Sequence, residues 1–300
     1  MTDTASPQAS RRHALSVGAL GFGALSLGTA ALAGLGGGLG AGSAQAATAK
    51  GFDLGNKADF LTAIQKMRGA LDERICMGYV KGLYYGVVDA KIRPLYGVLG
   101  GTFSRYKKLP DGNFEGRTFE VAYFTDWNTG QLLETFDNPY TGEKVTVPQT
   151  RMGPSTVLIT AEGVEAAGAA ARGLQFTHRF LPARVVNNDV WIVEETMVGT
   201  PPEFKGPRFA YNEVTTYQTT LTELNDAKLK QTATHVHFNG IVSWRPWLKM
   251  GDRPGHLLGN ATGRRLEKMT DYPKEYQEWT QKYHPDVWAD PGAILSGKDG

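Results

Sequence analysis

Apolar residues recur with helical spacing near the start of the part of the chain that looks globular. Phe60, Ile64, Met67 and Leu71 lie three or four positions apart and therefore form one apolar stripe. Asn56 stands just before this stripe, where its side chain can accept hydrogen bonds from the first backbone N–H groups of a helix. We therefore expect an amphipathic helix from Asn56 to about Leu71.

From Cys76 onward the pattern changes to short alternating runs rich in Tyr, Val, Phe and Thr. Turn-forming tripeptides separate these runs: Pro110-Asp111-Gly112, Asn128-Thr129-Gly130, Tyr140-Thr141-Gly142 and Asn187-Asn188-Asp189. No helical pattern intervenes, which favours a mainly β, antiparallel meander. Closure removes exposed strand edges, so we expect a lipocalin-like barrel, closed or nearly closed. A β-sandwich is the alternative.

The ends of the strand region are less regular. The Ala/Gly-rich stretch from Thr156 to Leu174 is interpreted as a connection between two sets of strands. We expect the last strand to end near Trp244, followed by a segment with many prolines and glycines. A helix from Pro273 to Tyr283 should follow, with proline at its first position. Both this helix and the N-terminal one are expected to pack outside the barrel.

The N-terminal segment resembles a twin-arginine export signal. Ser10-Arg11-Arg12-His13-Ala14-Leu15 precedes a long Ala/Gly/Leu stretch that ends in Ala44-Gln45-Ala46, a small-residue cleavage site. We expect residues 1–46 to be removed after export by the twin-arginine translocase, and residues 47–300 to work in the periplasm without a stable membrane anchor. The only cysteine, Cys76, cannot form an internal disulfide, which suits a protein folded before export.

Size and charge narrow the possible functions. Removing 46 of 300 residues leaves 254, which suits one barrel-like domain with a sizeable core. The signal carries two arginines and one aspartate, so the formal net charge falls from +2 to +1 without it. This value argues against nucleic-acid binding. Aromatic residues make up 10% of the chain, which is compatible with a pocket for a small aromatic or hydrophobic molecule.

One alternating run places a carboxyl group among aromatic rings. From Phe209 to Leu221, one face carries Tyr211, Glu213 and Tyr217. Desolvation there would raise the pKa of Glu213 and suit it to acid or base catalysis, whereas pairing with an arginine would make it structural. We predict Glu213 as a catalytic residue and the two tyrosines as substrate contacts.

Histidines on two other runs are further candidates. His235 and His237 are two positions apart and share a strand face with Asn239, so both imidazoles could face one substrate or metal. The opposite face carries Val236 and Phe238; if that face is the core, both histidines point to solvent or to a polar lumen. The glutamate that a cupin-like metal site needs after the second histidine is missing, so we predict no metal site.

His178 lies between Phe176 and Phe180 on a strand face, which makes it a candidate for the barrel interior, although a hydrogen-bonded core histidine is the commoner case. Glu194 and Glu195 follow an apolar run, so one of them faces inward whichever face is buried. The sequence leaves open which one.

Several segments resemble the family known as domain of unknown function 1838. These are Trp244-Arg245-Pro246-Trp247-Leu248-Lys249-Met250-Gly251-Asp252-Arg253-Pro254-Gly255-His256-Leu257, Gly263-Arg264-Arg265-Leu266, Met67-Arg68-Gly69-Ala70-Leu71-Asp72, Arg93-Pro94-Leu95-Tyr96-Gly97-Val98 and Asn138-Pro139-Tyr140-Thr141-Gly142-Glu143. The resemblance implies a compact, β-rich secreted protein but supplies no reaction. Within these segments, Trp244 and Arg264 are candidate substrate contacts. Arg264 or Arg265 could hold an anionic or phenolate oxygen, or form a structural salt bridge.

Residues 47–300 lack a nucleophile elbow, a phosphate-binding loop, paired cysteines and a His-Glu-x-x-His helix. We therefore expect a cofactor-independent enzyme that moves protons on a small aromatic compound. A carbon–carbon lyase that releases formaldehyde from lignin-derived aryl dimers is favoured over a hydrolase or an oxidoreductase. The expected catalytic residues are Glu213, His178, His237 and His235, and the expected substrate contacts are Tyr211, Tyr217, Asn239, Trp244 and Arg264. The alternatives are a lipocalin-like carrier of a small hydrophobic ligand and a metal enzyme.

Overall fold

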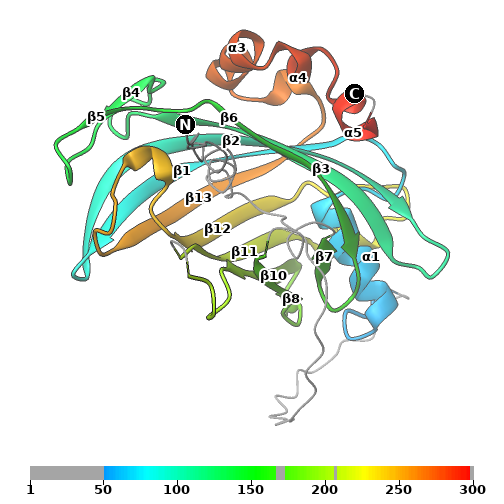
Figure 1. Ribbon diagram of the computed structural model, residues 1–300. Helices are drawn as coiled ribbons and strands as arrows, with labels where there is room; N and C mark the ends of the chain where they lie inside the picture. The colour runs from blue at the N-terminus through cyan, green and yellow to red at the C-terminus, as the bar shows by residue number, and fades with distance from the viewer. Residues whose placement is uncertain (1–50, 167–172, 206–207, 298–300) are drawn as a thin grey trace, which may run out of the picture.

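One antiparallel sheet dominates the computed structural model, which describes residues 51–166, 173–205 and 208–297 (Figure 1). The predicted export signal lies outside these residues. Ten strands follow one path in the order β7-β6-β3-β2-β1-β13-β12-β11-β10-β8, and β9 pairs with β10 beside it. The strands are β1 (Cys76–Val88), β2 (Lys91–Lys108), β3 (Phe114–Thr125), β6 (Thr150–Ile159), β7 (Val164–Ala166), β8 (Gln175–Phe180), β9 (Arg184–Val186), β10 (Asp189–Gly199), β11 (Ala210–Thr220), β12 (His235–Val242) and β13 (His256–Leu266).

The sheet curls until its two edge strands meet. The backbone N–H of Phe180 in β8 donates to the carbonyl of Glu162, just before β7, at 3.3 Å. The result is a nearly closed barrel, as the alternating pattern predicted, and not two packed sheets. The predicted turns lie between strands where expected. One of them, Tyr140-Thr141-Gly142, lies in a separate two-stranded hairpin formed by β4 (Thr135–Asp137) and β5 (Lys144–Thr146).

The helices cover different parts of the barrel (Figure 1). The helices and 3-10 turns are α1 (Lys57–Arg68), α2 (Leu221–Asn225), η2 (Pro246–Leu248), η3 (Met269–Asp271), α3 (Lys274–Tyr283), α4 (Pro285–Ala289) and α5 (Pro291–Ser296). The last three pack outside, with α3 and α5 against β3. The predicted C-terminal helix is confirmed, with Pro273 as its cap residue. Among the described residues, no helix is both long and apolar enough to cross a bilayer.

The N-terminal helix α1 begins and ends where local chemistry dictates. The side chain of Asn56 accepts hydrogen bonds from the backbone N–H groups of Ala58 (2.9 Å) and Asp59 (3.2 Å). The helix ends at Gly69. Its apolar stripe does not lie on the outer wall of the barrel: it packs with interior residues of β3, β10 and β11 at one end of the barrel. Helix α1 therefore closes this end.

Two expectations about strands were wrong. The sheet continues beyond Trp244 with β13, which lies between β1 and β12. Glycines obscure the strand pattern there; at Gly263 a β-carbon would lie 1.7 Å from the carbonyl oxygen of Tyr79, so close strand packing requires glycine. The expected connection from Thr156 to Leu174 instead contains the end of β6 and all of β7. Residues 167–172 of that stretch lie outside the described part of the chain.

Inside the barrel, a polar layer separates two apolar clusters. One cluster gathers at the η2 end around Tyr96 and Phe124, and the other at the α1 end around Ile64 and Ile192. Buried interior residues between the two clusters are polar, and we call them the polar layer: Ser104, Thr118, Glu120, Glu194, Thr196, Glu213 and Thr215. The interior faces of β2, β3, β10 and β11 therefore pass from apolar through polar to apolar surroundings, and the two apolar clusters flank the polar layer.

If α1 closes the barrel end, shortening its buried side chains should destabilise the protein. Met67 is fully buried, so Met67→Ala should lower the free energy of unfolding by about 2–5 kcal/mol through the cavity it leaves. Lys57→Ala is the control, because the Lys57 side chain is 81% exposed and should change stability by less than about 0.5 kcal/mol. Chemical denaturation measures both. Equal denaturation midpoints for the two variants would contradict this packing.

Candidate functional site

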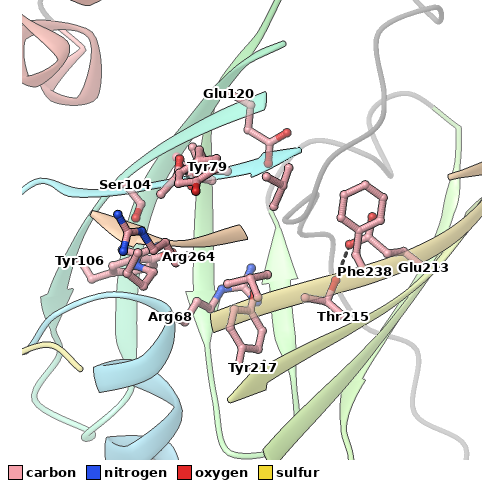
Figure 2. A pocket seen from close by; sticks show the side chains of 16 residues that line it. Arg68, Tyr79, Ser104, Tyr106, Glu120, Glu213, Thr215, Tyr217, Phe238 and Arg264 are labelled. Atoms are coloured by element: carbon pink, nitrogen blue, oxygen red, sulfur yellow. Dashed lines mark hydrogen bonds between the residues drawn. The ribbon is translucent and has the colours of Figure 1, made fainter. Parts of the chain in front are cut away.

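The polar layer contains a cavity of ≈ 70 Å³ (Figure 2). A water molecule needs about 10–15 Å³ by the same measure, so the cavity has room for a few waters or for one end of a larger molecule. Strands from both walls and α1 contribute the lining residues: Arg68, Gly78, Tyr79, Val80, Thr102, Ser104, Tyr106, Thr118, Glu120, Glu213, Thr215, Tyr217, Val236, Phe238, Arg264 and Arg265. Ionisable side chains are thus concentrated at a place that is largely removed from water.

Glu120 projects from β3 into this cavity (Figure 2). It is 5% exposed, and neither of its carboxyl oxygens has a hydrogen-bond partner among the described residues. The pairing of β3 with β6 shifts register between Thr118 and Glu120. Gly153 of β6 adopts a φ of +91° beside this shift, where a β-carbon would lie 2.8 Å from the Thr118 carbonyl oxygen. Such irregularities often reorient side chains next to functional sites.

Burial raises the pKa of Glu120 well above its usual value. The negative charge of Glu213 raises this pKa further, and Arg68 opposes the rise with a smaller effect. Glu120 therefore favours the neutral carboxylic acid, whose O–H group is available to donate a hydrogen bond or a proton.

Glu213 lies on β11, on the wall that faces Glu120, and is 3% exposed (Figure 2). Both of its oxygens accept hydrogen bonds: Oε2 from the hydroxyl of Tyr211, and Oε1 from the hydroxyl of Thr215 at 2.6 Å. The alternation in the sequence predicted this shared face, and the structure confirms it. Two carboxyl groups in unlike surroundings therefore line one cavity, one without partners and one that accepts two hydrogen bonds.

A buried ion pair borders the cavity on the α1 side. Arg68 donates to Oε2 of Glu194, and the hydroxyl of Tyr217 donates to Oε1 at 3.0 Å. Burial alone would raise the pKa of Glu194, but Arg68 and then His178 outweigh it, so that pKa is lowered. Burial alone would lower the pKa of Arg68, but the charge of Glu194 and smaller effects of nearby tyrosines outweigh it, so that pKa is raised. Of the two adjacent glutamates, Glu194 therefore faces the interior as an ion, whereas Glu195 pairs with Arg179 outside.

His178 lies behind this ion pair and is not among the cavity-lining residues. Its Nδ1 accepts a hydrogen bond from the backbone N–H of Val164 at 3.1 Å, and its Nε2 lies 3.3 Å from Oε2 of Glu194. This arrangement places a proton on Nε2 that is donated to Glu194. The histidine expected to act on substrate is therefore separated from the cavity by Glu194, which does not line the cavity either but binds Arg68 and Tyr217, which do.

The structure corrects the expected placement of three residues on β12. His235, His237 and Asn239 are exposed, because Phe238 occupies the interior face of this strand. The side-chain amide of Asn239 lies 3.1 Å from Nε2 of His237 on the outer surface. These side chains therefore do not share the cavity with Glu213.

The remaining predicted substrate contacts divide between the cavity and its surroundings. Tyr217 lines the cavity, and Tyr211 reaches it through Glu213. Trp244 lies at the η2 end, where its Nε1 donates to the carbonyl of Arg253 at 3.2 Å and its ring packs on Tyr140. It does not line the cavity.

Arg264 borders the cavity but is exposed, opposite the equally exposed His235 on the neighbouring strand. Arg265, the next residue, carries two buried nitrogen atoms, Nε and Nη2, that lack hydrogen-bond partners among the residues that the structure describes. Of the two arginines considered from the sequence, the predicted substrate contact Arg264 is therefore the exposed one, and Arg265 faces the cavity.

Glu120 and Arg68 were missed by the sequence analysis. Alternation along β3 puts Glu120 on the face of Phe124, which is a signal of the kind used for Glu213. It was hidden because α3 and α5 cover the outer face of β3, so both faces of this strand are apolar. Within the described ranges, no group of three or more His, Cys, Asp or Glu side chains is placed to hold a metal ion.

The raised pKa of Glu120 predicts a pH effect on stability. Its folded pKa lies above the ordinary value of 4.5, so the native state holds this proton more tightly than the unfolded chain does. The stabilising contribution is complete below about pH 4.5 and is lost as the pH rises towards the folded pKa. Glu120→Gln should remove this decline, and Glu195→Gln should keep it, as measured by chemical denaturation across pH. Identical pH profiles for Glu120→Gln and the unaltered protein would refute the shift.

Comparisons with known proteins give a family but no characterised relative. A family model described as "Protein of unknown function (DUF1838)" matches residues 74–299. No curated protein and no solved structure is significantly similar to the chain. The matched region includes every strand of the barrel and all lining residues of the cavity except Arg68. The chain belongs to the family of domain of unknown function 1838.

Proposed function

We propose that this protein is an enzyme that transfers protons on a small organic molecule bound in the cavity, with Glu213 as the base and Glu120 as the acid. The observation that carries this proposal is the carboxyl group of Glu120, which is buried at the cavity wall with no hydrogen-bond partner in the described part of the chain. A buried polar group without a partner is costly to stability, so its retention points to a partner outside the chain.

The different surroundings of the two carboxyl groups support different roles. A neutral acid that faces a hydrogen-bonded carboxyl group is the usual arrangement by which one site runs acid and base steps together. Glu120 has a proton to give, and Glu213 is oriented by Tyr211 and Thr215. Positioned proton transfer of this kind contributes about 10²–10⁴-fold to a rate.

The specific reaction that we propose is a carbon–carbon lyase step without a cofactor, on a lignin-derived aryl dimer that carries a hydroxymethyl group. Glu213 takes the hydroxyl proton, and the oxygen electrons form the carbonyl bond of formaldehyde. The bond from the hydroxymethyl carbon to its neighbour breaks, its electron pair passes to the aryl-conjugated carbon, and Glu120 gives that carbon a proton. The products are formaldehyde and a compound one carbon shorter, and proton exchange restores both carboxyl groups.

The size of the cavity limits how such a molecule binds. At ≈ 70 Å³ the cavity admits the reacting end and not a whole aryl dimer. The remainder of such a substrate would therefore lie outside this cavity.

The alternative predicted from the sequence, a carrier of a small hydrophobic ligand, is compatible with a barrel. A cavity for such a ligand is lined mainly by apolar side chains. Here Arg68, Glu120 and Glu213 line it instead, and their burial would be costly without serving a carrier. This contrast is why we favour an enzyme.

We also propose that the enzyme works in the periplasm after export by the twin-arginine pathway. Support comes from the sequence of residues 1–46. The single cysteine, Cys76, is free and buried, so the fold does not depend on a disulfide formed after export.

Replacing either carboxyl group should abolish turnover without unfolding the protein. We expect Glu120→Gln and Glu213→Gln each to lower kcat by about 10²–10⁴-fold, because each removes one proton transfer. Glu195→Gln, a matched change on the outer face, should keep full activity. The assay follows formaldehyde release from hydroxymethyl-bearing aryl dimers. Full turnover by both cavity variants would eliminate these roles, and absence of formaldehyde with the unaltered protein would eliminate the lyase step.

A further inference from the structure

We propose that the substrate carries a carboxylate group, which Arg265 binds side-on through its Nε and Nη2 atoms. This inference names a substrate class for the cavity described above and rests on the proposed function only for the reaction that follows binding.

Arg265 is placed to meet a ligand. It lies on β13 opposite Gly78 of β1, and both residues line the cavity. Its Nε and Nη2 atoms are buried and have no hydrogen-bond partner within residues 51–166, 173–205 and 208–297. Across the cavity, Arg68 also lines the wall, but its guanidinium is paired with Glu194. Among the described residues, no carboxylate forms an ion pair with Arg265.

The identity of the unpartnered atoms defines the ligand. Nε and Nη2 lie on one edge of the guanidinium, where their N–H groups point in parallel towards the same side. The two oxygens of a carboxylate match this edge with two hydrogen bonds, whereas a phenolate or an alkoxide offers one oxygen. Arg265 also interacts with the buried thiol of Cys76: burial raises the thiol pKa, and the charge of Arg265 and a side-chain hydrogen bond from it oppose the rise. This contact locates the guanidinium inside the wall.

The charges inside the barrel favour the same ligand. Three guanidinium groups are inside: Arg68, Arg265 and Arg245, the last 5% exposed and bound to the hydroxyl of Tyr84 at 3.2 Å. With Glu120 neutral, Glu194 and Glu213 supply at most two negative charges against these three positive ones. An anionic ligand would reduce this excess of positive charge.

Benzoate and benzamide test the proposal, because they share a shape and differ in charge and in the second oxygen. Titration calorimetry with the unaltered full chain should show benzoate binding at least about tenfold more tightly than benzamide. Arg265→Gln and Arg265→Lys should each weaken benzoate binding about tenfold or more, since lysine keeps the charge but loses the two-donor edge. Arg184→Gln, an exposed change on β9, is the matched control and should keep benzoate affinity.

Several results would overturn the proposal. The first two are no detectable benzoate binding and equal affinity for both probes. The other two are unchanged benzoate affinity in Arg265→Gln, and a loss of benzoate affinity in Arg264→Gln but not in Arg265→Gln. The comparison of the two probes uses only the unaltered protein, so it holds even if an arginine variant does not fold.

Glu120→Gln separates this proposal from the proposed function. If Arg265 binds the carboxylate and Glu120 serves the reaction, Glu120→Gln should keep benzoate affinity while turnover is lost. Retained turnover with benzoate binding dependent on Arg265 would reject the acid role of Glu120 and leave the carboxylate site standing. Lost turnover in Glu120→Gln, together with benzoate binding that does not depend on Arg265, would reject the carboxylate site alone.

Discussion

The structure and its proposed chemistry depend on one constraint: the carboxyl group of Glu120 is enclosed in the barrel, and no described residue forms a hydrogen bond with it. Water would stabilise the charged form of Glu120, and the two apolar clusters keep bulk water away from it. The same shielding strengthens the attraction between Arg68 and Glu194. Glu120 consequently favours its neutral form, while Arg68 and Glu194 are held as an ion pair nearby.

The fold produces this site by an arrangement along its strands. On β3, the interior face runs from Phe124 through Glu120 to Phe114, and on β11 it runs from Tyr211 through Glu213 to Tyr217. The apolar ends contribute the packing, so the middle can hold polar groups without loss of the core. Helix α1 completes the enclosure and contributes a charge through Arg68.

The sequence predicted those parts of the molecule in which one strand face is polar and the other is apolar. Alternation along β11 identified the interior position of Glu213. On β12 the same rule gave two answers for His237, because alternation shows which residues share a face but not which face is inside. On β3 the rule gave no contrast, since the C-terminal helices bury its outer face and hide Glu120. The ion pair of Arg68 with Glu194 joins residues 126 positions apart, which no local pattern reveals.

The most direct test is a site-specific titration of Glu120 by carbon NMR, with side-chain ¹³C-labelled glutamate and Glu120→Gln to assign the resonance. The account predicts that the carboxyl carbon of Glu120 keeps the chemical shift of a protonated acid at pH values well above 4.5, where an ordinary glutamate is ionised. A resonance that titrates near the ordinary glutamate pKa of 4.5 would contradict it.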